Sequence, residues 1–123
     1  MAIYIEKKEK LNLNVSNPDN DVKITVDCYI GTVAEVAVDT GRIITIGCGE
    51  TKTIGIASAL KGITLAFDGD ADNPDNNQIK ISHKIFEVDG NEINYTFPDD
   101  YTGNPPYDNA DKNPSYTFFV NFK

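Results

Sequence analysis

The residues best suited to do chemistry lie in the stretch DGDADNPDNN, residues 68–77. Its four aspartates are Asp68, Asp70, Asp72 and Asp75. Calcium takes about six to eight oxygen ligands, and a loop of alternating carboxylates is able to wrap one ion. The EF-hand pattern fails, because the sixth and twelfth positions counted from Asp68 hold Asn73 and Ile79 instead of glycine and glutamate. The stretch therefore predicts either a calcium site on the four aspartates or a solvated turn, since aspartate and asparagine favour turns.

The same stretch resembles two kinds of calcium-binding protein. Asp68 and Asp70 in FDGDADNPDNNQI are similar to the paired aspartates in the third loop of calcium-dependent phospholipid-binding sandwiches of the synaptotagmin kind, with Asp75 offset by one residue from the next aspartate of that loop. The other ligand loop would be NPDND, residues 17–21. The stretch also resembles the acidic loop of small two-calcium bacterial lectins, although their C-terminal glycine corresponds to Lys123 here. Both resemblances imply a calcium-dependent module for a membrane or carbohydrate surface.

A second candidate site is the long connection PDDYTGNPPYDNADKNP, residues 98–114, which holds four of the six prolines of the chain. Loops of this length without regular structure are usually functional or disordered. Tyr101 and Tyr107 are flat amphipathic side chains, and with Asp108 they suit a protein interface or a sugar site. The connection therefore predicts an interface, or else a loop that the tyrosines pack on its own domain.

The sequence offers no recognisable catalytic constellation. The four serines lie in no nucleophile-elbow context, and the glycines of GCGETKT, residues 47–53, precede no helix that would cradle a phosphate. The single histidine, His83, falls between Ile81 and Ile85 on the apolar face of a predicted strand. This placement favours a structural histidine that bonds the backbone over an acid–base group. We expect a protein that is not an enzyme.

Charge restricts the partners. The chain has 11 lysines and arginines against 19 aspartates and glutamates, for a formal net charge of −8. This sign repels phosphate backbones, and the densest basic run, Lys7–Lys8 with Lys10, is broken by Glu9. We therefore expect no nucleic acid partner, whereas metal cations or basic proteins suit an acidic surface.

The start, MAIYIEKKEK, lacks the basic leader, apolar run and small-residue cleavage site of a signal peptide. No stretch approaches the roughly 20 apolar residues of a membrane helix. We expect a protein made in the cytoplasm, with leaderless export left open.

Cys28 and Cys48 share strand parity with apolar neighbours, so we predict two core-facing free thiols in preference to a disulfide.

The elements that must position these residues are strands, because alternation with a period of two runs through nearly the whole chain. The predicted strands are 22–29, 32–38, 42–46, 51–56, 62–67, 78–88, 92–97 and 115–122, with AIYI and LNLNV as two further strands or one bent strand. Only residues 56–62 suggest a helical turn. Eight or nine short strands predict one all-β domain over residues 1–123, a single antiparallel β-sandwich of jelly-roll or immunoglobulin-like type.

One hairpin is predicted in detail. In FEVDGNEINYTF, a three-residue loop over residues 89–91 would pair Ile85 with Tyr95 and gather the apolar side chains on one face. That loop needs a left-handed residue, for which Gly90 or Asn91 is suited.

These observations predict a non-catalytic structural or interaction module, either a homo-oligomer or one subunit of a larger protein assembly. The alternative is a calcium-dependent module that binds a carbohydrate or a membrane surface. No cofactor is expected under the first hypothesis, and calcium is expected under the second.

Overall fold

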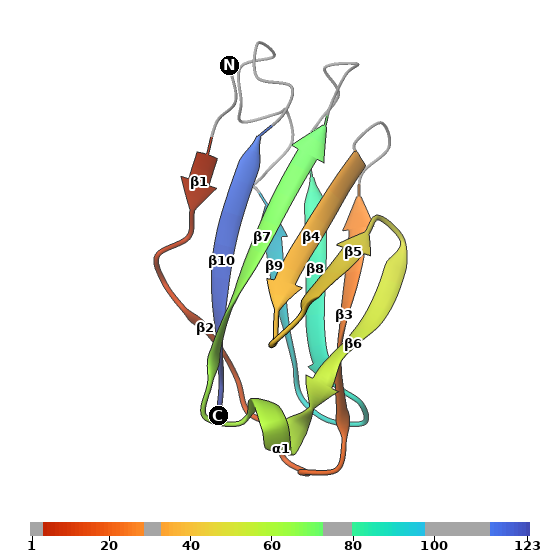
Figure 1. The fold of residues 1–123 in the computed structure, drawn as a ribbon, viewed down its shortest axis with the longest axis vertical. Coiled ribbons are helices and arrows are strands. Elements are labelled where there is room, and N and C mark those ends of the chain that lie inside the picture. The colour runs from red at the N-terminus through yellow and green to blue at the C-terminus, as the bar shows by residue number, and fades with distance from the viewer. Residues whose placement is uncertain (1–3, 29–32, 73–79, 98–113) are drawn as a thin grey trace.

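The computed structural model describes residues 4–28, 33–72, 80–97 and 114–123. Within these residues the chain forms ten strands and one short helix, arranged as two facing sheets (Figure 1). The predicted all-β sandwich is therefore confirmed. The strands outnumber the predicted eight or nine, because both N-terminal segments form strands of their own.

One sheet, called sheet A, contains six strands. In order they are β1 (Tyr4–Glu6), β10 (Ser115–Phe122), β7 (Thr64–Asp72), β4 (Val33–Asp39) and β5 (Ile43–Gly47), with β2 (Leu11–Leu13) also paired to β10. The pairings among β10, β7, β4 and β5 are antiparallel. β1 and β2 run parallel to β10, so the sandwich is not wholly antiparallel as predicted.

The other sheet, sheet B, contains four antiparallel strands. In order they are β6 (Glu50–Ile56), β3 (Asp21–Cys28), β8 (Ile81–Glu87) and β9 (Glu92–Phe97). The helix α1 (Ala57–Leu60) leads from β6 towards β7 and buries Ala57 and Leu60, which confirms the helical turn predicted in this region. Among the described residues, no helix has the length and apolar character needed to cross a bilayer.

The chain follows the same path twice. In the unit β3–β6, strand β6 returns beside β3, while β4 and β5 form a hairpin in the opposite sheet. In the unit β7–β10, strand β10 returns beside β7, while β8 and β9 form the hairpin across the sandwich. Each unit has the Greek-key order in which the fourth strand lies beside the first. Because β3 pairs with β8 and β4 with β7, each unit completes the sheets of the other.

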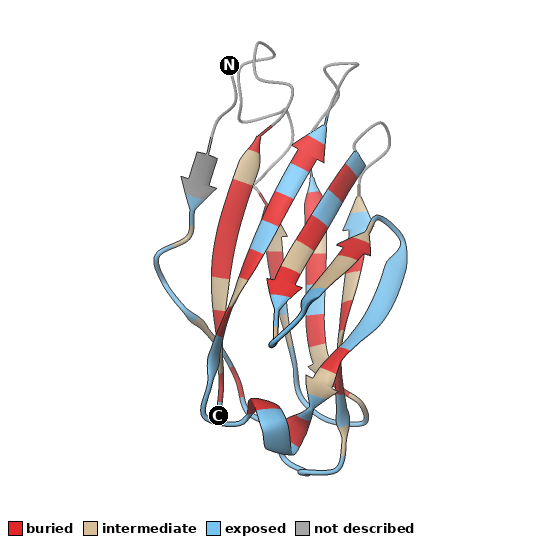
Figure 2. Cartoon of the chain, in the orientation of Figure 1, coloured by how far each residue is buried: buried red, intermediate tan, exposed pale blue. Residues whose placement is uncertain are grey.

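The core lies between the sheets, where strands such as β3, β4, β7 and β8 bury alternate residues (Figure 2). Its centre is aromatic: the Phe97 ring stacks on Tyr116 with centroids 4.0 Å apart, and Phe67 stacks on Phe118 at 5.0 Å. Gly69 lies directly opposite Tyr116 on the neighbouring strand. A Cβ at that position would lie 2.0 Å from the Tyr116 ring, so the tyrosine occupies the space that a side chain would need.

The β8–β9 hairpin corrects the predicted register. Ile85 pairs with Ile93, not with Tyr95, so the pairing differs by two residues from the prediction. An even shift leaves every side chain on its predicted face, which is why the apolar face itself is correct. The turn has the predicted three residues but lies one residue earlier, at 88–90, since the Glu87 N–H donates to the Asn91 carbonyl. Asp89 holds the left-handed conformation, with φ of 58°, in place of the residues predicted for it.

The prediction of two free core thiols is wrong, because Cys28 and Cys48 form a disulfide with their Cα atoms 5.4 Å apart. Strand register explains the pair: Val26 lies opposite Glu50, and continuing that antiparallel register by two residues sets the cysteines opposite each other. Cys28 is half-buried, as its strand parity predicted. Cys48 is exposed, because β5 ends at Gly47 and the chain turns before the parity can continue.

Candidate interaction surface on sheet A

Three of the predicted calcium ligands lie on a strand and not in a loop. Asp68, Asp70 and Asp72 are exposed residues of β7 that alternate with buried Gly69 and Ala71. Their side chains therefore project from the outer face of sheet A in a row, with about 7 Å between successive positions. The predicted turn is thus corrected for this part of the stretch. Asp75 lies outside the residues that the structure describes.

Hydroxyl groups of β10 bind two of these carboxylates. The Thr117 hydroxyl donates to Asp68 Oδ1 at 2.6 Å, and the Ser115 hydroxyl donates to Asp70 Oδ1 at 2.7 Å. Both pairs are directly opposite in the β10–β7 register, which places hydroxyl and carboxylate side by side. On the other side of β7, Glu35 lies opposite Asp70, so the face carries closely spaced negative charge.

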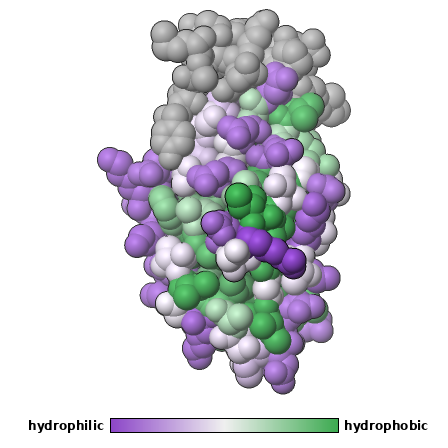
Figure 3. Space-filling view, viewed as in Figure 1, coloured by the Kyte–Doolittle hydropathy of each residue, from purple (hydrophilic) through white to green (hydrophobic). Residues whose placement is uncertain are grey.

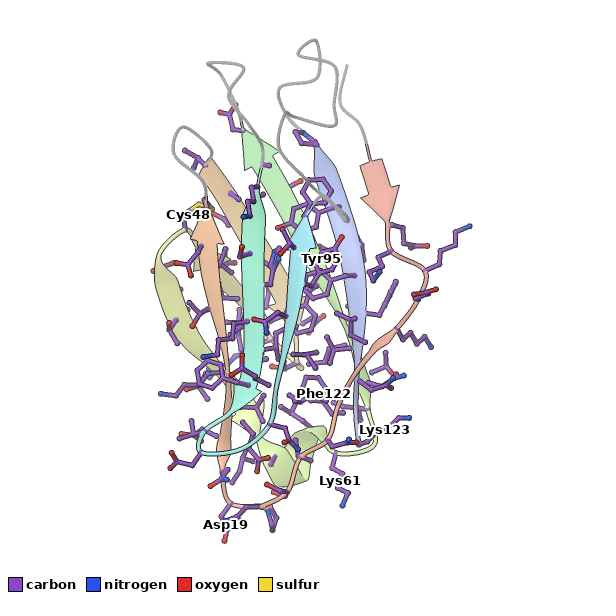
Figure 4. All side chains as sticks on the ribbon, turned by 180° about the vertical axis from the view of Figure 1, so that it is seen from behind. Asp19, Cys48, Lys61, Tyr95, Phe122 and Lys123 are labelled. Carbon is purple, nitrogen blue, oxygen red and sulfur yellow. A yellow bond between two sulfur atoms is a disulfide. The ribbon has the colours of Figure 1, made fainter. Side chains whose placement is uncertain are left out.

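A straight row of carboxylates does not converge on one point. Among the described residues, no group of three or more histidine, cysteine, aspartate or glutamate side chains lies close enough to hold a metal ion. The second loop implied by the synaptotagmin-like resemblance, residues 17–21, lies at the α1 end of the sandwich, where Figure 4 labels Asp19. β7 finishes with Asp72 at the opposite end, so these two segments are separated by the length of the sheet.

Below this row of aspartates, called the acidic row, the same face carries several apolar residues, interrupted by exposed Asp39 opposite Ile43. Ala66, Ala37 and Phe119 are half-buried outer-face residues of the three central strands, and Ile43 at the start of β5 is 70% exposed. Arg42 is exposed in the turn immediately before Ile43. Figure 3 views this face and shows hydrophobic side chains in its middle and lower part, with hydrophilic ones above them, along the edges and across the middle. These four apolar residues are called the apolar patch below.

The predicted interface residues Tyr101, Tyr107 and Asp108 all lie outside the described residues. Their role stays a prediction.

His83 is a core residue, as predicted. It is 1% exposed, and its two ring nitrogens lie 2.9 Å from the Tyr95 carbonyl oxygen and 2.6 Å from the Tyr116 hydroxyl. A carbonyl only accepts, so Nδ1 carries the proton and the Tyr116 hydroxyl donates to Nε2. Burial lowers the pKa of His83 to about 4, against the opposing effect of the Tyr95 carbonyl. Burial also raises the pKa of Tyr116, so both groups are neutral near pH 7.

Glu87 is a buried acid that the sequence analysis missed. Its Oε1 accepts hydrogen bonds from the N–H and hydroxyl of Ser16, and its Oε2 accepts from the Asn17 N–H and the Asn20 side-chain amide. The Ser16 N–H is the main cause that lowers the pKa of Glu87, burial opposes it, and the asparagines lower it further. The sequence did contain a signal for it. Glu87 has the same strand parity as His83 and Ile85, which lie on the buried face, so an acid at this position is expected to be buried.

No protein-family model, curated protein or solved structure matches the chain.

Proposed function

We propose that this domain is a non-catalytic interaction module that assembles through the outer face of sheet A, with a second copy of the chain as its partner. The apolar patch carries the proposal. The solvated face of an antiparallel sheet normally carries polar residues, whereas here it presents exposed Ile43 on β5 and half-buried Phe119 on β10, with Asp39 of β4 and Ala66 of β7 between them. Apolar patches rimmed by polar residues are typical of protein interaction sites.

The charges around the patch support a partner that is another copy of this chain. The acidic row lies towards the end of sheet A where β7 finishes, and Arg42, the single arginine, lies in the β4–β5 turn, at the end of β4 away from Asp72. Two copies that pack face to face in opposite directions would bring Arg42 of each against the acidic row of the other. Such a two-fold interface is self-complementary and closes as a dimer. Opposite charges would then fix the orientation while the patch supplies the buried area.

Two further expectations remain proposals. The 98–114 connection, with Tyr101, Tyr107 and Asp108, is a second surface through which larger assemblies would form. The choice between jelly-roll and immunoglobulin-like architecture stays a prediction, to which the two Greek-key units add the observed strand order.

The disulfide supports work in an oxidising compartment, where such bonds persist, over residence in a reducing cytoplasm.

Sedimentation equilibrium over a wide range of protein concentrations tests the proposal. We expect the wild type to dimerise and Ile43→Glu to weaken the dimer at least tenfold, which corresponds to about 1.4 kcal/mol. Ile56→Glu is the matched control, since Ile56 is also exposed, at 39%, but belongs to β6 of sheet B. A wild type that stays monomeric at every concentration, or equal effects of the two variants, would remove the support for this face.

A charge reversal tests the orientation separately. Arg42→Glu should weaken the dimer, and added salt should weaken the wild-type dimer but not the Arg42→Glu dimer. Dimerisation that survives Ile43→Glu but is lost in Tyr101→Ala with Tyr107→Ala would instead place the interface in the 98–114 connection.

A further inference from the structure

Strand β9 forms one edge of sheet B, and β8 is its one neighbour among the residues that the structure describes. In the hairpin that joins them, the Glu87 N–H donates to the Asn91 carbonyl. In an antiparallel pair, hydrogen-bonded positions alternate with positions whose backbone groups point away from the partner. The N–H and C=O groups of Glu92, Asn94 and Thr96 therefore point away from β8, towards the open edge of the sheet.

The other edges of the two sheets carry protective features that β9 lacks. On β5, Lys52 Nζ donates to the Thr45 carbonyl at 2.6 Å, and Glu50 Oε1 accepts the Gly47 N–H at 2.6 Å. The pairing of β6 with β3 is interrupted by a register shift next to Val22, and β1 and β2 have three residues each. β9 has six residues, without lysine, proline, glycine or a register shift. Short strands, bulges and charged side chains prevent edge pairing, so β9 is the edge that is open to another strand.

Sheet A extends one strand farther than sheet B on the side of β9. β9 faces β10 across the core, because the Phe97 ring stacks on Tyr116 and the Tyr95 ring lies 4.4 Å from the Phe118 ring. β1 and β2 pair with the side of β10 that faces away from β7, so they lie beyond β9. Figure 4 shows β10 and the N-terminal segment extending past β9 on that side. An added strand beside β9 would therefore lie opposite β1 and β2.

The side chains at this step between the sheets are apolar in one place and positive in the next. Leu11 of β2 and Ile93 of β9 are half-buried hydrophobic residues packed against the core, so each keeps some surface for a partner. The Lys7 ammonium lies 5.9 Å from the centre of the Tyr95 ring, two residues along β9 from Ile93. The inward side chains of an added strand would thus meet apolar surface at one position and a positive charge two residues away.

A single extended strand fits this edge better than a second copy of the domain. Two copies joined by antiparallel β9 strands would place both sheets A on the same side of the joined sheet, where their projecting N-terminal strands would compete for one space. The same pairing would bring Lys7, Lys8 and Lys10, the densest basic run of the chain, close to their equivalents in the other copy. A lone peptide strand avoids both penalties, and an acidic side chain on it would be attracted to Lys7.

We propose that the β9 edge binds an extended peptide segment of a partner protein as a fifth strand of sheet B. Main-chain hydrogen bonds to Glu92, Asn94 and Thr96 supply the binding, and alternate side chains select the sequence. Because sheet B is antiparallel, the peptide carries an acidic residue opposite Tyr95 and, two residues later, an apolar residue opposite Ile93. This edge is separate from the outer face of sheet A, so the domain would hold a second copy and a peptide at the same time.

Fluorescence anisotropy on the full chain tests strand addition. The probe is a short labelled peptide of alternating threonine and valine, in which glutamate replaces the valine that lies two positions before the central one. A second peptide has the same side chains but N-methyl groups on the threonine amides, which would face β9. We expect saturable binding of the first peptide and no binding of the second, because N-methylation removes the main-chain donors. Equal binding of the two peptides, or no binding of the first, overturns the proposal.

A proline on the edge tests the position of the peptide. Asn94→Pro removes an N–H that points away from β8, so it leaves the β8–β9 hydrogen bonds in place and should leave the Tm close to that of the wild type. We expect this variant to bind the first peptide about tenfold more weakly, through one lost hydrogen bond and the bulk of the ring. Asn94→Ala is the matched control, since it keeps the N–H and should bind as the wild type does. Equal binding by Asn94→Pro and Asn94→Ala would contradict pairing at β9.

The acidic preference has its own test. Lys7→Ala should weaken binding of the glutamate peptide about twofold to fivefold and leave binding of the corresponding glutamine peptide unchanged. Lys8→Ala is the matched control, because Lys8 is exposed and Lys7 is the lysine that lies over Tyr95. Equal losses for both peptides in Lys7→Ala would reject the acidic preference.

Sedimentation of the same variants keeps this proposal apart from dimerisation through sheet A. Asn94→Pro should self-associate as the wild type does, because β9 lies outside the apolar patch. If Asn94→Pro instead abolishes self-association and no peptide binds the wild type, a second copy occupies the edge and the peptide proposal is overturned. A wild type that stays monomeric but binds the peptide would reject the sheet A interface and support the β9 site.

Discussion

The carboxylate of Glu87 receives the backbone N–H of Ser16 at 2.8 Å, although the two residues stand 71 positions apart in the chain. The contact joins the β8–β9 turn to the segment between β2 and β3. Gly90 makes room for it, because a Cβ there would lie 2.7 Å from Glu87 Oε1. One buried acid thus fixes two connections at the α1 end of the sandwich.

Replacing this acid should destabilise the fold. Glu87→Gln removes the charge and puts an amide donor where two donors now converge, so the N–H groups of Ser16 and Asn17 lose part of their acceptor. We expect a clearly lower Tm in Glu87→Gln. Glu92→Gln is the control, since that glutamate is exposed and near Lys84. Thermal unfolding of both variants at pH 7 gives the comparison, and equal Tm values would show that the hydrogen bonds to Glu87 contribute nothing to stability.

Stability should fall in mild acid because of His83. Its pKa is about 4 when folded and about 6.5 when unfolded, so the unfolded chain binds the proton first as pH falls. The contribution is fully present above pH 6.5 and is lost progressively down to about pH 4, by up to about 3 kcal/mol. Denaturant unfolding between pH 7 and 5 reports on His83 and not on Glu87, because the pKa of Glu87 is lowered and that carboxylate stays ionised over this range in the folded protein. In His83→Gln, the free energy of unfolding should depend less on pH over this range. An unchanged pH dependence would mean that another group causes the loss of stability.

A methyl group at position 69 should be poorly tolerated. Gly69→Ala places a Cβ against the Tyr116 ring, where buried atoms surround it and no flexible side-chain end is able to yield. Overpacking of this kind costs about 1–3 kcal/mol. Gly55→Ala is the matched strand variant, with its nearest atom, Leu60 Cγ, at 3.4 Å. In chemical denaturation, the free energy of unfolding of Gly69→Ala should be clearly lower than that of Gly55→Ala. The opposite order would contradict the packing described.

Reduction of the Cys28–Cys48 disulfide should lower the free energy of unfolding, whereas reductant would have no effect on two free thiols. Cys28 and Cys48 are separated by 20 residues, and opening a loop of this length costs about 3 kcal/mol. The double variant Cys28→Ala with Cys48→Ala should unfold at the same temperature with or without reductant. A wild-type Tm that reductant leaves unchanged would show that the bond does not stabilise the fold.

Calcium should leave the Tm unchanged if Asp68 and Asp70 only form hydrogen bonds within sheet A and bind no ion. Both already accept hydroxyl hydrogen bonds in a straight strand, which leaves them poorly placed to share one ion. Under the calcium-dependent alternative, a hundredfold excess over Kd would stabilise the fold by about 2.7 kcal/mol. Thermal unfolding in millimolar calcium against chelator distinguishes the two, with Asp70→Asn as the variant that would abolish any gain.

Strand positions were largely predictable, because apolar residues recur at a period of two wherever a strand has one buried face. The row on β7 escaped this rule. Its inner residues are Gly69 and Ala71, and their small size made the sequence look like a turn. The space they leave is filled by Tyr116, whose position depends on a pairing some 45 residues away in the chain. Such long-range compensation overrides local propensity.

The disulfide escaped prediction for a related reason. Parity along one strand tells which face a side chain takes, but it cannot tell which residue of another strand lies opposite. Cys48 meets Cys28 only because β6 follows β5 in the opposite sheet and pairs with β3 in a particular register. The hydrogen bonds from Ser16 and Asn17 to Glu87 likewise need the segment before β3 to pass beside the end of β8.

The doubled Greek-key path has a consequence for how the chain is made. Strands β3 and β4 each need a neighbour from the second unit, β8 and β7, so the first unit alone leaves two long strands without one partner. β10 then joins β7 to the N-terminal strands β1 and β2. A nascent chain that has emerged only through β6 would carry unpaired apolar strands, which are prone to aggregate. Completion of the sheets waits for β10, so a ribosome-bound chain would depend on protection from chaperones until that strand has emerged.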